Sequence, residues 1–332
     1  MAKRYIYQVV IALLPLFGSC NSNTSQKPQA IALWPQVQDP YHNTYTPARY
    51  KLGEKLFFEP LLSKNNTLSC ASCHIPEKAF ADNEIISPGV NPQILGVRNT
   101  PSILNRAYLP HLMTEGSIKS LEHFSIAPLQ ENKEMHQNIA KSVEKIADNP
   151  EYISLFKEAY DTIPSIKYIP RALAVYQRYL LSKGSKFDAY LAGNTNALNQ
   201  QEKAGMKLFY SERTNCGKCH SGFLLSDFKF HNIGILNTKP DSGRYRLTGI
   251  PEDSLAFKTP SLRNVGITYP YMHDGQFQSL DEVLAFYNKG GENIPRKSEL
   301  IKPLGLNTEE IAQIKAFLLT LTDTIQYSTP VK

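Results

Sequence analysis

The sequence has 332 residues, of which 42% are hydrophobic, and its formal net charge is +6. Its 36 basic and 30 acidic residues form no basic stripe, which argues against a nucleic-acid partner. The chain is longer than a single hydrophobic core usually requires, so its length predicts two domains.

The first 20 residues are typical of a bacterial lipoprotein signal peptide. Lys3 and Arg4 precede an apolar run from Val9 to Phe17, and the segment ends at Cys20. The apolar run is short for a membrane span. We expect export to the periplasm and lipidation of Cys20, which would anchor the protein to the membrane; cleavage without lipidation is the alternative. Residues 21–45 would form a tether and an N-terminal extension, and removing the leader's two basic residues lowers the net charge from +6 to +4.

Two Cys-x-x-Cys-His pentads, at 70–74 and 216–220, carry the main chemical signal. In c-type haem proteins the two thiols attach the porphyrin and the adjacent histidine ligates the iron. A zinc site would leave that histidine without a role, and disulfide-rich scaffolds are usually much smaller. The sequence therefore predicts two covalently bound haem c groups, held by Cys70, Cys73, His74, Cys216, Cys219 and His220.

The two halves of the chain repeat one plan. A helix-like segment that ends in Leu-Phe lies before each pentad, at 50–58 and 204–210, and a Thr-Pro-Ser motif lies after each, within 98–105 and 258–264. Because proline is favoured in the first turn of a helix, these motifs predict a helix start after each haem. The repetition indicates duplication of a cytochrome c module.

Apolar residues recur at spacings of three and four in several further segments, and no comparable run of alternating strands occurs. This pattern predicts a mainly α fold with long loops, built from two tandem cytochrome c-like haem domains. The polar stretch from Lys183 to Gly193 contains two glycines and marks the expected boundary. The segments with helical spacing are 139–146, 172–181, 280–287 and 311–321.

The stretches 211–220 and 257–275 resemble the bacterial di-haem cytochrome c peroxidases and their MauG-type relatives, and the similarity runs from about Lys51 to the C-terminus. The resemblance implies a peroxide-reactive haem domain over 46–185, an electron-transfer haem domain over 186–332, and a calcium ion between the haems. Reduction of hydrogen peroxide takes two electrons, so a second haem can hold one oxidising equivalent.

Two residues bear on the distal side of the first haem. In many of these peroxidases a histidine caps the oxidised N-terminal iron, and the resemblance puts Asn91 at that position, which implies an open iron that needs no reductive activation. The family's distal glutamate falls on Glu134, which would move a proton between the peroxide oxygens. The alternative for Glu134 is a solvent-exposed charge beside Glu131 and Lys133.

The chain departs from the family in the segment 112–117. A Phe-Trp-Asp-Gly-Arg-like motif usually stands there, so the tryptophan between the haems is missing, and the only tryptophan of the chain is Trp34. A distal glutamine is replaced by Phe124, with His123 beside it. These changes put rapid electron transfer between the haems, and efficient turnover, in question.

The resemblance also assigns iron and calcium ligands in the C-terminal half. The distal ligand of the second haem is methionine in standard peroxidases and tyrosine in MauG-type enzymes, and it falls on Tyr287; a core tyrosine, with Met272 as the ligand instead, is the alternative. The calcium ligands fall on Asn99, Thr268 and Pro270, since side-chain amide and backbone carbonyl oxygens suit a hard cation. Ordinary turn geometry is the alternative for those loops.

These observations favour a periplasmic di-haem peroxidase that reduces hydrogen peroxide with electrons from a small donor protein, such as a cytochrome c or a cupredoxin. His74 and His220 would be the proximal ligands. A MauG-type oxidase that modifies a partner protein and a di-haem electron carrier are the alternatives. A homodimer is possible, although no motif specifies one.

Overall fold

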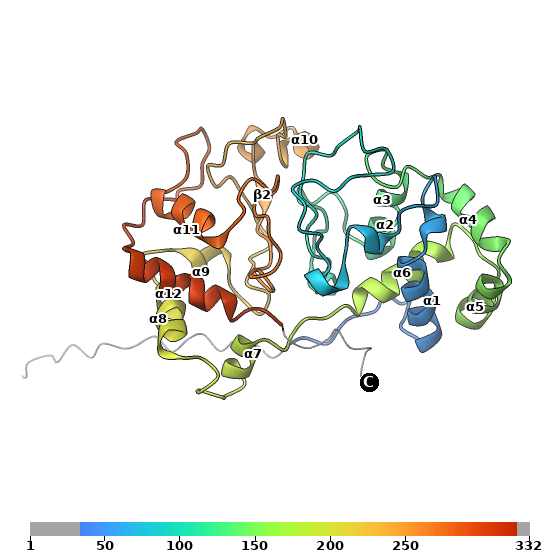
Figure 1. Cartoon of the computed structure of the whole chain (residues 1–332), viewed down its shortest axis with the longest axis horizontal. Coiled ribbons are helices and arrows are strands. Elements are labelled where there is room, and N and C mark those ends of the chain that lie inside the picture. The colour runs from blue at the N-terminus through green and yellow to red at the C-terminus, as the bar shows by residue number, and fades with distance from the viewer. Residues whose placement is uncertain (1–33, 324–332) are drawn as a thin grey trace, which may run out of the picture. The chain divides into compact units, whose positions relative to one another are not determined.

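Helices make up most of the regular structure in the computed structural model, which describes residues 34–323 (Figure 1). The predicted leader, Cys20 and most of the tether lie outside the described residues. The α-helices of the first half are α1 (Pro47–Phe57), α2 (Leu121–Phe124), α3 (Ala127–Gln130), α4 (Ile139–Ala147), α5 (Pro150–Tyr160) and α6 (Tyr168–Arg178). Those of the second half are α7 (Lys186–Leu191), α8 (Gln200–Phe209), α9 (Cys216–Cys219), α10 (Tyr245–Thr248), α11 (Leu280–Lys289) and α12 (Thr308–Leu319).

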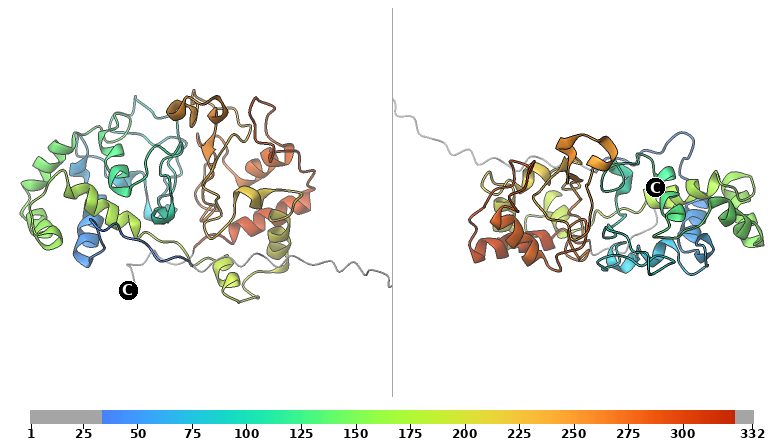
Figure 2. Two further views of the ribbon diagram at one scale, coloured as in Figure 1. Left: turned by 180° about the vertical axis from the view of Figure 1, so that it is seen from behind. Right: turned by 90° about the horizontal axis from the view of Figure 1, so that it is seen from above.

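Short 3₁₀ turns and one small sheet complete the regular structure. The 3₁₀ turns are η1 (Pro60–Leu62), η2 (Cys70–Ser72), η3 (Pro76–Lys78), η4 (Arg106–Tyr108) and η5 (Pro251–Asp253). Strands β1 (Phe230–His231) and β2 (Phe257–Lys258) pair antiparallel, with Phe230 opposite Lys258. The prediction of a mainly α fold is confirmed, and Figure 2 shows from two further sides how much of the chain runs in loops between the helices. No helix among residues 34–323 is both long enough and apolar enough to cross a membrane.

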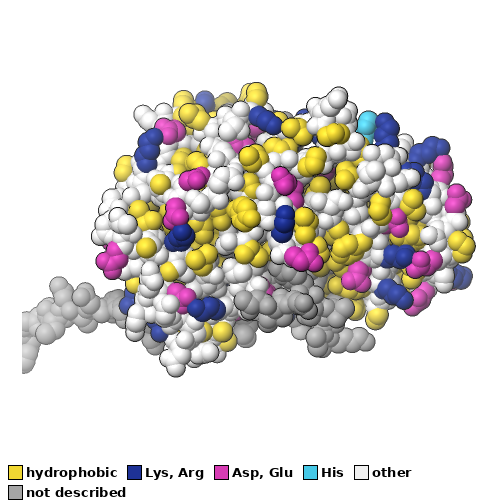
Figure 3. Space-filling model, viewed as in Figure 1, with side chains coloured by type: hydrophobic (Ala, Val, Ile, Leu, Met, Phe, Trp, Pro, Cys, Tyr) yellow, Lys and Arg dark blue, Asp and Glu magenta, His cyan; other side chains and the backbone are white. Residues whose placement is uncertain are grey.

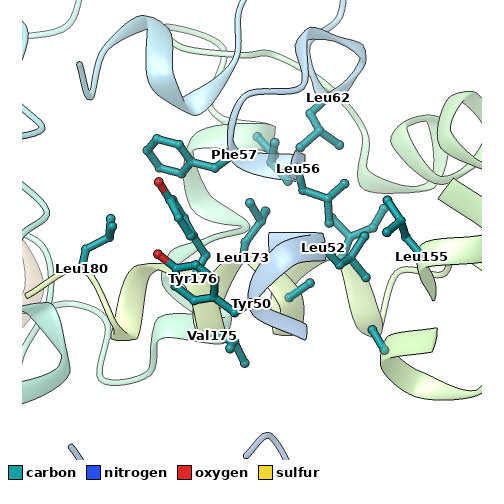
Figure 4. Packing of buried hydrophobic residues seen from close by; sticks show 14 of the residues in the cluster. Tyr50, Leu52, Leu56, Phe57, Leu62, Leu155, Leu173, Val175, Tyr176 and Leu180 are labelled. Carbon is teal, nitrogen blue, oxygen red and sulfur yellow. The ribbon is translucent and has the colours of Figure 1, made fainter. Parts of the chain in front are cut away.

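The core of the N-terminal half forms where α1 packs against α6. Thr46 caps α1 by accepting a hydrogen bond from the backbone of Arg49, and the apolar side chains of α1 meet those of α5 and α6 (Figure 4). Leu52 and Leu56 are completely buried in this cluster. Gly53 lies at the closest approach, because a Cβ atom there would stand 2.1 Å from the carbonyl oxygen of Ala172 in α6.

The C-terminal half repeats this packing with α8 and α12. A Cβ atom on Gly205 would stand 1.8 Å from the carbonyl oxygen of Gln313. Gly53 and Gly205 both lie three residues before the Leu-Phe pair that ends their helix. The shared glycine and the shared helix contact are structural evidence for the duplication that the sequence predicts.

The predicted helix starts at Pro101 and Pro260 are wrong. In both motifs the hydroxyl of the serine after the proline bonds to nearby backbone. Ser102 accepts a hydrogen bond from the backbone N–H of Leu104, and Ser261 accepts one from the backbone N–H of Arg263. Such side-chain contacts compete with helical hydrogen bonds, and each motif instead ends at an asparagine with left-handed backbone, at Asn105 and Asn264.

The two asparagines meet in the connection between the halves. Asn105 exchanges two hydrogen bonds with the backbone of Ser182, and the amide of Asn264 donates to the Ser182 hydroxyl at 2.9 Å. Helix α7 follows within the segment expected to hold the boundary, and its Phe187 packs against Phe317 of α12 with ring centroids 5.2 Å apart. This packing supports a boundary near 185 and 186, which stays a prediction.

The visible face of the molecule mixes charges of both signs with apolar side chains (Figure 3). Lysine and arginine side chains lie next to aspartate and glutamate over the described residues on that face. This distribution agrees with the absence of a basic stripe in the sequence.

Candidate functional site

One cavity of about 690 Å³ runs past both Cys-x-x-Cys-His pentads. Residues of both halves line it, and most of its surface is apolar. The predicted site residues on its wall are Cys70, Cys73, His74, Asn99, Glu134, Cys216, Cys219, His220, Thr268, Pro270, Met272 and Tyr287. The fold therefore brings together residues that lie more than 200 positions apart in the sequence.

The histidine of each pentad is held in the same way. His74 Nδ1 lies 2.9 Å from the carbonyl oxygen of Phe80, and His220 Nδ1 lies 3.0 Å from that of Leu225. A backbone carbonyl only accepts, so Nδ1 carries the proton and Nε2 keeps its lone pair for a metal. This arrangement fits a proximal iron ligand in both halves.

The serines of the Thr-Pro-Ser motifs support these two histidine contacts. Ser102 Oγ donates to the carbonyl of Ala79 at 2.6 Å, and Ser261 Oγ donates to the carbonyl of Leu224 at 2.7 Å. Each of these carbonyls belongs to the residue directly before the one that accepts from the histidine. The serine that prevents a helix start thus fixes the loop that orients the ligand.

The four pentad cysteines fit thioether attachment. They form no disulfide, and burial raises the pKa of the Cys70 thiol to about 12 and that of the Cys73 thiol to about 11. Burial likewise raises the pKa of both thiols of the second pentad, Cys216 and Cys219. An environment that disfavours thiolates suits a neutral thioether better than the thiolate ligands of a zinc site.

Glu134 lies on the cavity wall near the first pentad. The residue is exposed, yet the surrounding protein removes enough water to raise its pKa to about 7, with the Glu131 carboxylate adding to the rise. A carboxyl group with a pKa near neutrality can both accept and donate a proton. The contact with the cavity favours the acid/base interpretation over that of a surface charge.

Asn91 does not line the cavity. Its side-chain oxygen accepts a hydrogen bond from the backbone of Gln93, which closes a local turn. The histidines on the described cavity wall are His74, His220, His231 and His273. None of them comes from the segment between the first pentad and Asn91, and the open first haem stays a prediction.

Within the segment 112–117, Glu115 belongs to a charged cluster that no local sequence pattern predicts. Glu115 is 1% exposed, forms an ion pair with Arg98, and accepts from Arg246 at 2.9 Å. Arg98 also pairs with Asp241 at 2.6 Å. Thr114 lies on the cavity wall in the segment that lacks the expected tryptophan.

Trp34 packs at a different place. Its ring lies 5.8 Å from that of Tyr108 and 5.1 Å from that of Phe223, centroid to centroid, and the Arg263 guanidinium lies 4.8 Å above it. Tyr108 belongs to the first half, whereas Phe223 follows the second pentad. The tryptophan therefore contacts both halves without lining the cavity.

Tyr287 and Met272 both line the cavity. Burial raises the pKa of the Tyr287 phenol, and the nearby sulfur atoms of Cys216 and Cys219 add to the rise. The effect of these sulfur atoms indicates that the phenol lies near the cysteines that would attach the second haem. Both residues remain candidates for the distal ligand.

The predicted calcium ligands Asn99, Thr268 and Pro270 all line the cavity. The Asn99 amide nitrogen donates to the carbonyl of Glu84 at 2.6 Å, and its backbone N–H donates to the carbonyl of His273 at 2.8 Å. The second of these contacts joins the two halves of the chain. The calcium site stays a prediction.

Comparison of the sequence with known families gives one clear match. Residues 47–196 match the family described as di-haem cytochrome c peroxidase. The chain is 36% identical over 288 residues to the methylamine utilization protein MauG of Methylorubrum extorquens, covering 86% of this chain and 81% of that protein. It is 34% identical over 359 residues to the cytochrome-c peroxidase IdrP1 of Pseudomonas sp., covering 97% and 93%.

Solved structures show the same fold. A MauG-like protein associated with microbial copper homeostasis aligns with a TM-score of 0.84 and 31% identity, covering 93% of this chain and 98% of that one. The di-haem peroxidase BthA of Burkholderia thailandensis aligns with a TM-score of 0.76 at 24% identity, covering 86% and 88%. The second likeness concerns the fold alone.

Proposed function

Because this chain belongs to the di-haem cytochrome c peroxidase family, which includes MauG, we propose that it is a periplasmic peroxidase. It would reduce hydrogen peroxide to water with electrons from a small donor protein, such as a cytochrome c or a cupredoxin. Membership of the family implies two haem c groups. The four pentad cysteines would attach them, and His74 and His220 would ligate the two irons.

The position of Glu134 carries this proposal. The carboxyl group lies on the cavity wall near the first pentad, and its pKa of about 7 leaves a large fraction ionised at neutral pH. The haem iron supplies the redox chemistry at this place. Glu134 would accept a proton from the oxygen nearer the iron and return it to the outer oxygen, so that the outer oxygen leaves as water.

The net reaction consumes two electrons and two protons per peroxide and yields two molecules of water. A donor protein would supply the electrons, and the haem that Cys216, Cys219 and His220 would hold is suited to carry them. Since Asn91 closes a turn outside the cavity, no side chain from that position would block peroxide at the first iron.

A MauG-type oxidase is the second candidate, and the position of Tyr287 favours it. A phenolate ligand would donate charge to the second iron and stabilise its oxidised form, whereas Met272 would raise the potential. The relatives of this chain carry both names. In that case a partner protein, rather than a small donor, would give up the electrons.

Calcium would bind at Asn99, Thr268 and Pro270, between the two halves, where oxygen ligands are available. A pure electron carrier would need both irons to be six-coordinate. Glu134 on the cavity wall near the first pentad supplies an acid/base group that an electron carrier would not need, which argues against this function for the first haem.

Rapid mixing of the as-isolated diferric protein with hydrogen peroxide tests the proposal. We expect an immediate change in the Soret band without prior reduction, together with a high-spin signal in the EPR spectrum of the resting protein. Oxidised protein that stays inert until it receives one electron would contradict the open first haem. A resting spectrum that contains only low-spin haem would favour the electron carrier.

A further inference from the structure

Arg106 is a buried cation with no acidic partner among residues 34–323. The residue is 6% exposed, lies at the start of η4, and lines the cavity. Its guanidinium packs 4.4 Å from the ring centroid of Phe124, one Nη donates to the carbonyl of Ser102 at 3.3 Å, and Nε has no hydrogen-bond partner. A buried charge is costly unless an opposite charge pairs with it.

Lys258 brings a second cation to the same region from the other half of the chain. It lies on β2, and its ammonium donates to the carbonyls of His111 at 2.7 Å and Leu112 at 3.2 Å. Burial and the neighbouring Arg106 charge lower its pKa to about 7, against the opposite influence of Glu115. Two like charges that repel at close range are stabilised when an anion lies between them.

The other arginines on the cavity wall are already neutralised. Arg98 pairs with Asp241 and Glu115, Arg246 pairs with Glu115, and Arg263 pairs with Asp188 at 2.5 Å. Among the described residues, Arg106 and Lys258 have no carboxylate within ion-pair distance. Lys133 and Lys302 also line the cavity. Arg106 and Lys258 differ from them because they lie together: the Leu112 carbonyl that accepts from Lys258 belongs to a residue in one apolar cluster with Phe124, over whose ring the Arg106 guanidinium lies.

The place lies beside the first haem site. Arg106 and His74 line the same cavity, and the Ser102 carbonyl that accepts from Arg106 belongs to the serine whose hydroxyl holds the loop that orients His74. Haem carries two propionate carboxylates, which matches the two unbalanced cations in number and sign. A carboxylate is also the group that an arginine fork binds best.

We infer that Arg106 and Lys258 bind the propionate carboxylates of the haem attached at Cys70 and Cys73. This inference rests on the proposed di-haem function. Lys258 comes from the C-terminal half, so that half completes the carboxylate site of the N-terminal haem. The pairing screens the negative propionates from the iron, which raises the reduction potential of that haem.

Redox titration of the holoprotein, followed by absorption spectroscopy, tests the inference without any peroxide. Arg106→Gln and Lys258→Met should each shift the midpoint potential of the N-terminal haem downwards, while the haem content stays at two per chain. Resonance Raman bands of the propionates should shift in the same variants. Arg106→Lys, which keeps the charge, should restore most of the potential.

Arg178→Gln is the matched control. Arg178 is equally buried at 4% exposed, but it pairs with Glu122 at 2.7 Å and does not line the cavity. Its loss should leave both midpoint potentials unchanged. If the Arg106→Gln protein does not fold, Lys258→Met decides alone, and an unchanged potential in that variant overturns the inference.

A small free anion, instead of the propionates, is the other group that could bind between Arg106 and Lys258. The wild-type potential should not depend on the concentration of chloride or formate if the propionates occupy the site. A potential that follows the anion concentration would overturn the assignment. The wild-type protein could also fail to reduce peroxide while its variants show the expected shifts in potential. That result would contradict the proposed function and still support the propionate contacts.

Discussion

At the scale of single residues, Glu134 controls the expected pH dependence. Only the ionised carboxylate can accept a proton from peroxide, and its pKa of about 7 means that protonation removes this form as the pH falls. The rate of reaction with peroxide should therefore decrease below about pH 7. Glu134→Gln should slow the reaction roughly 10²-fold or more and abolish this acidic limb, with both haems still attached, as stopped-flow measurements over a pH series would show.

Glu131→Gln is the control for that experiment. The Glu131 carboxylate contributes to the raised pKa of Glu134, so its removal should lower that pKa and move the acidic limb to lower pH. The rate at high pH should stay near that of the wild type. Equal rates in the Glu134→Gln and wild-type proteins would identify Glu134 as a mere surface charge.

Tyr287 decides the ligand of the second iron. If its phenolate binds there, Tyr287→Phe should change the spectrum of the C-terminal haem and raise its midpoint potential, because a charge-donating ligand is lost. Tyr287→His should give a low-spin haem with two histidines. Met272→Leu should change nothing. The opposite pattern, with the weak far-red band of histidine and methionine ligation in the native protein, would assign Met272 instead.

At the scale of helices, the contact at Gly53 limits how α1 can vary. Alanine is the better helix former by about 1 kcal/mol, yet its Cβ atom would stand 2.1 Å from the Ala172 carbonyl oxygen. Gly53→Ala should therefore destabilise the protein by about 1–3 kcal/mol through overpacking. Denaturant unfolding measures this change. Lys51→Ala, at an exposed position of the same helix, should stay within about 0.5 kcal/mol of the wild type.

The helices also show what local sequence can predict. Segments with regular apolar spacing, such as 139–146 and 280–287, form α4 and α11. The spacing predicts these helices because apolar residues three and four positions apart lie on one helix face, which packs into the core. The starts expected at Pro101 and Pro260 failed for a reason that proline statistics do not include. There a serine hydroxyl bonds to nearby backbone and to a loop carbonyl, which the histidine ligand requires.

At the scale of the whole molecule, Glu115 links the two halves through charge. Burial alone would raise its pKa, but Arg98 and Arg246 outweigh this effect and lower it to about 2. A carboxyl group with a depressed pKa stabilises the fold above its unfolded pKa, and the stabilisation is lost as the pH falls from about 4.5 to about 2. This depression corresponds to roughly 3 kcal/mol.

Glu115→Gln should therefore lower the stability at neutral pH by roughly 3–5 kcal/mol, because two arginines lose their shared partner. It should also flatten the decline in stability between about pH 4.5 and pH 2. Unfolding curves at several pH values test both effects. Glu144→Gln is the control, since Glu144 forms an exposed pair with Lys141 and should change little.

Contacts of this kind are the part that sequence reasoning missed. The pentads, Glu134 and Tyr287 stand in motifs that are recognisable along the chain. Arg98 and Asp241, in contrast, are 143 residues apart, and Arg106 comes near Lys258 only after both halves have folded. Their role depends on which charges remain unpaired in the cavity, and no local pattern encodes that balance.

The position of Trp34 gives the protein a built-in optical probe. As the single tryptophan of the chain, it is the one indole emitter, and it rests on Tyr108 of one half and Phe223 of the other. Haem absorbs indole emission when the two are close, so fluorescence should be weak in the folded holoprotein. Detachment of the segment that carries Trp34 should restore the emission before the helices unfold. Tryptophan emission and the helical circular dichroism signal, followed in one unfolding experiment, would separate the two events. Coincident changes would mean that the segment and the helices come apart as one unit.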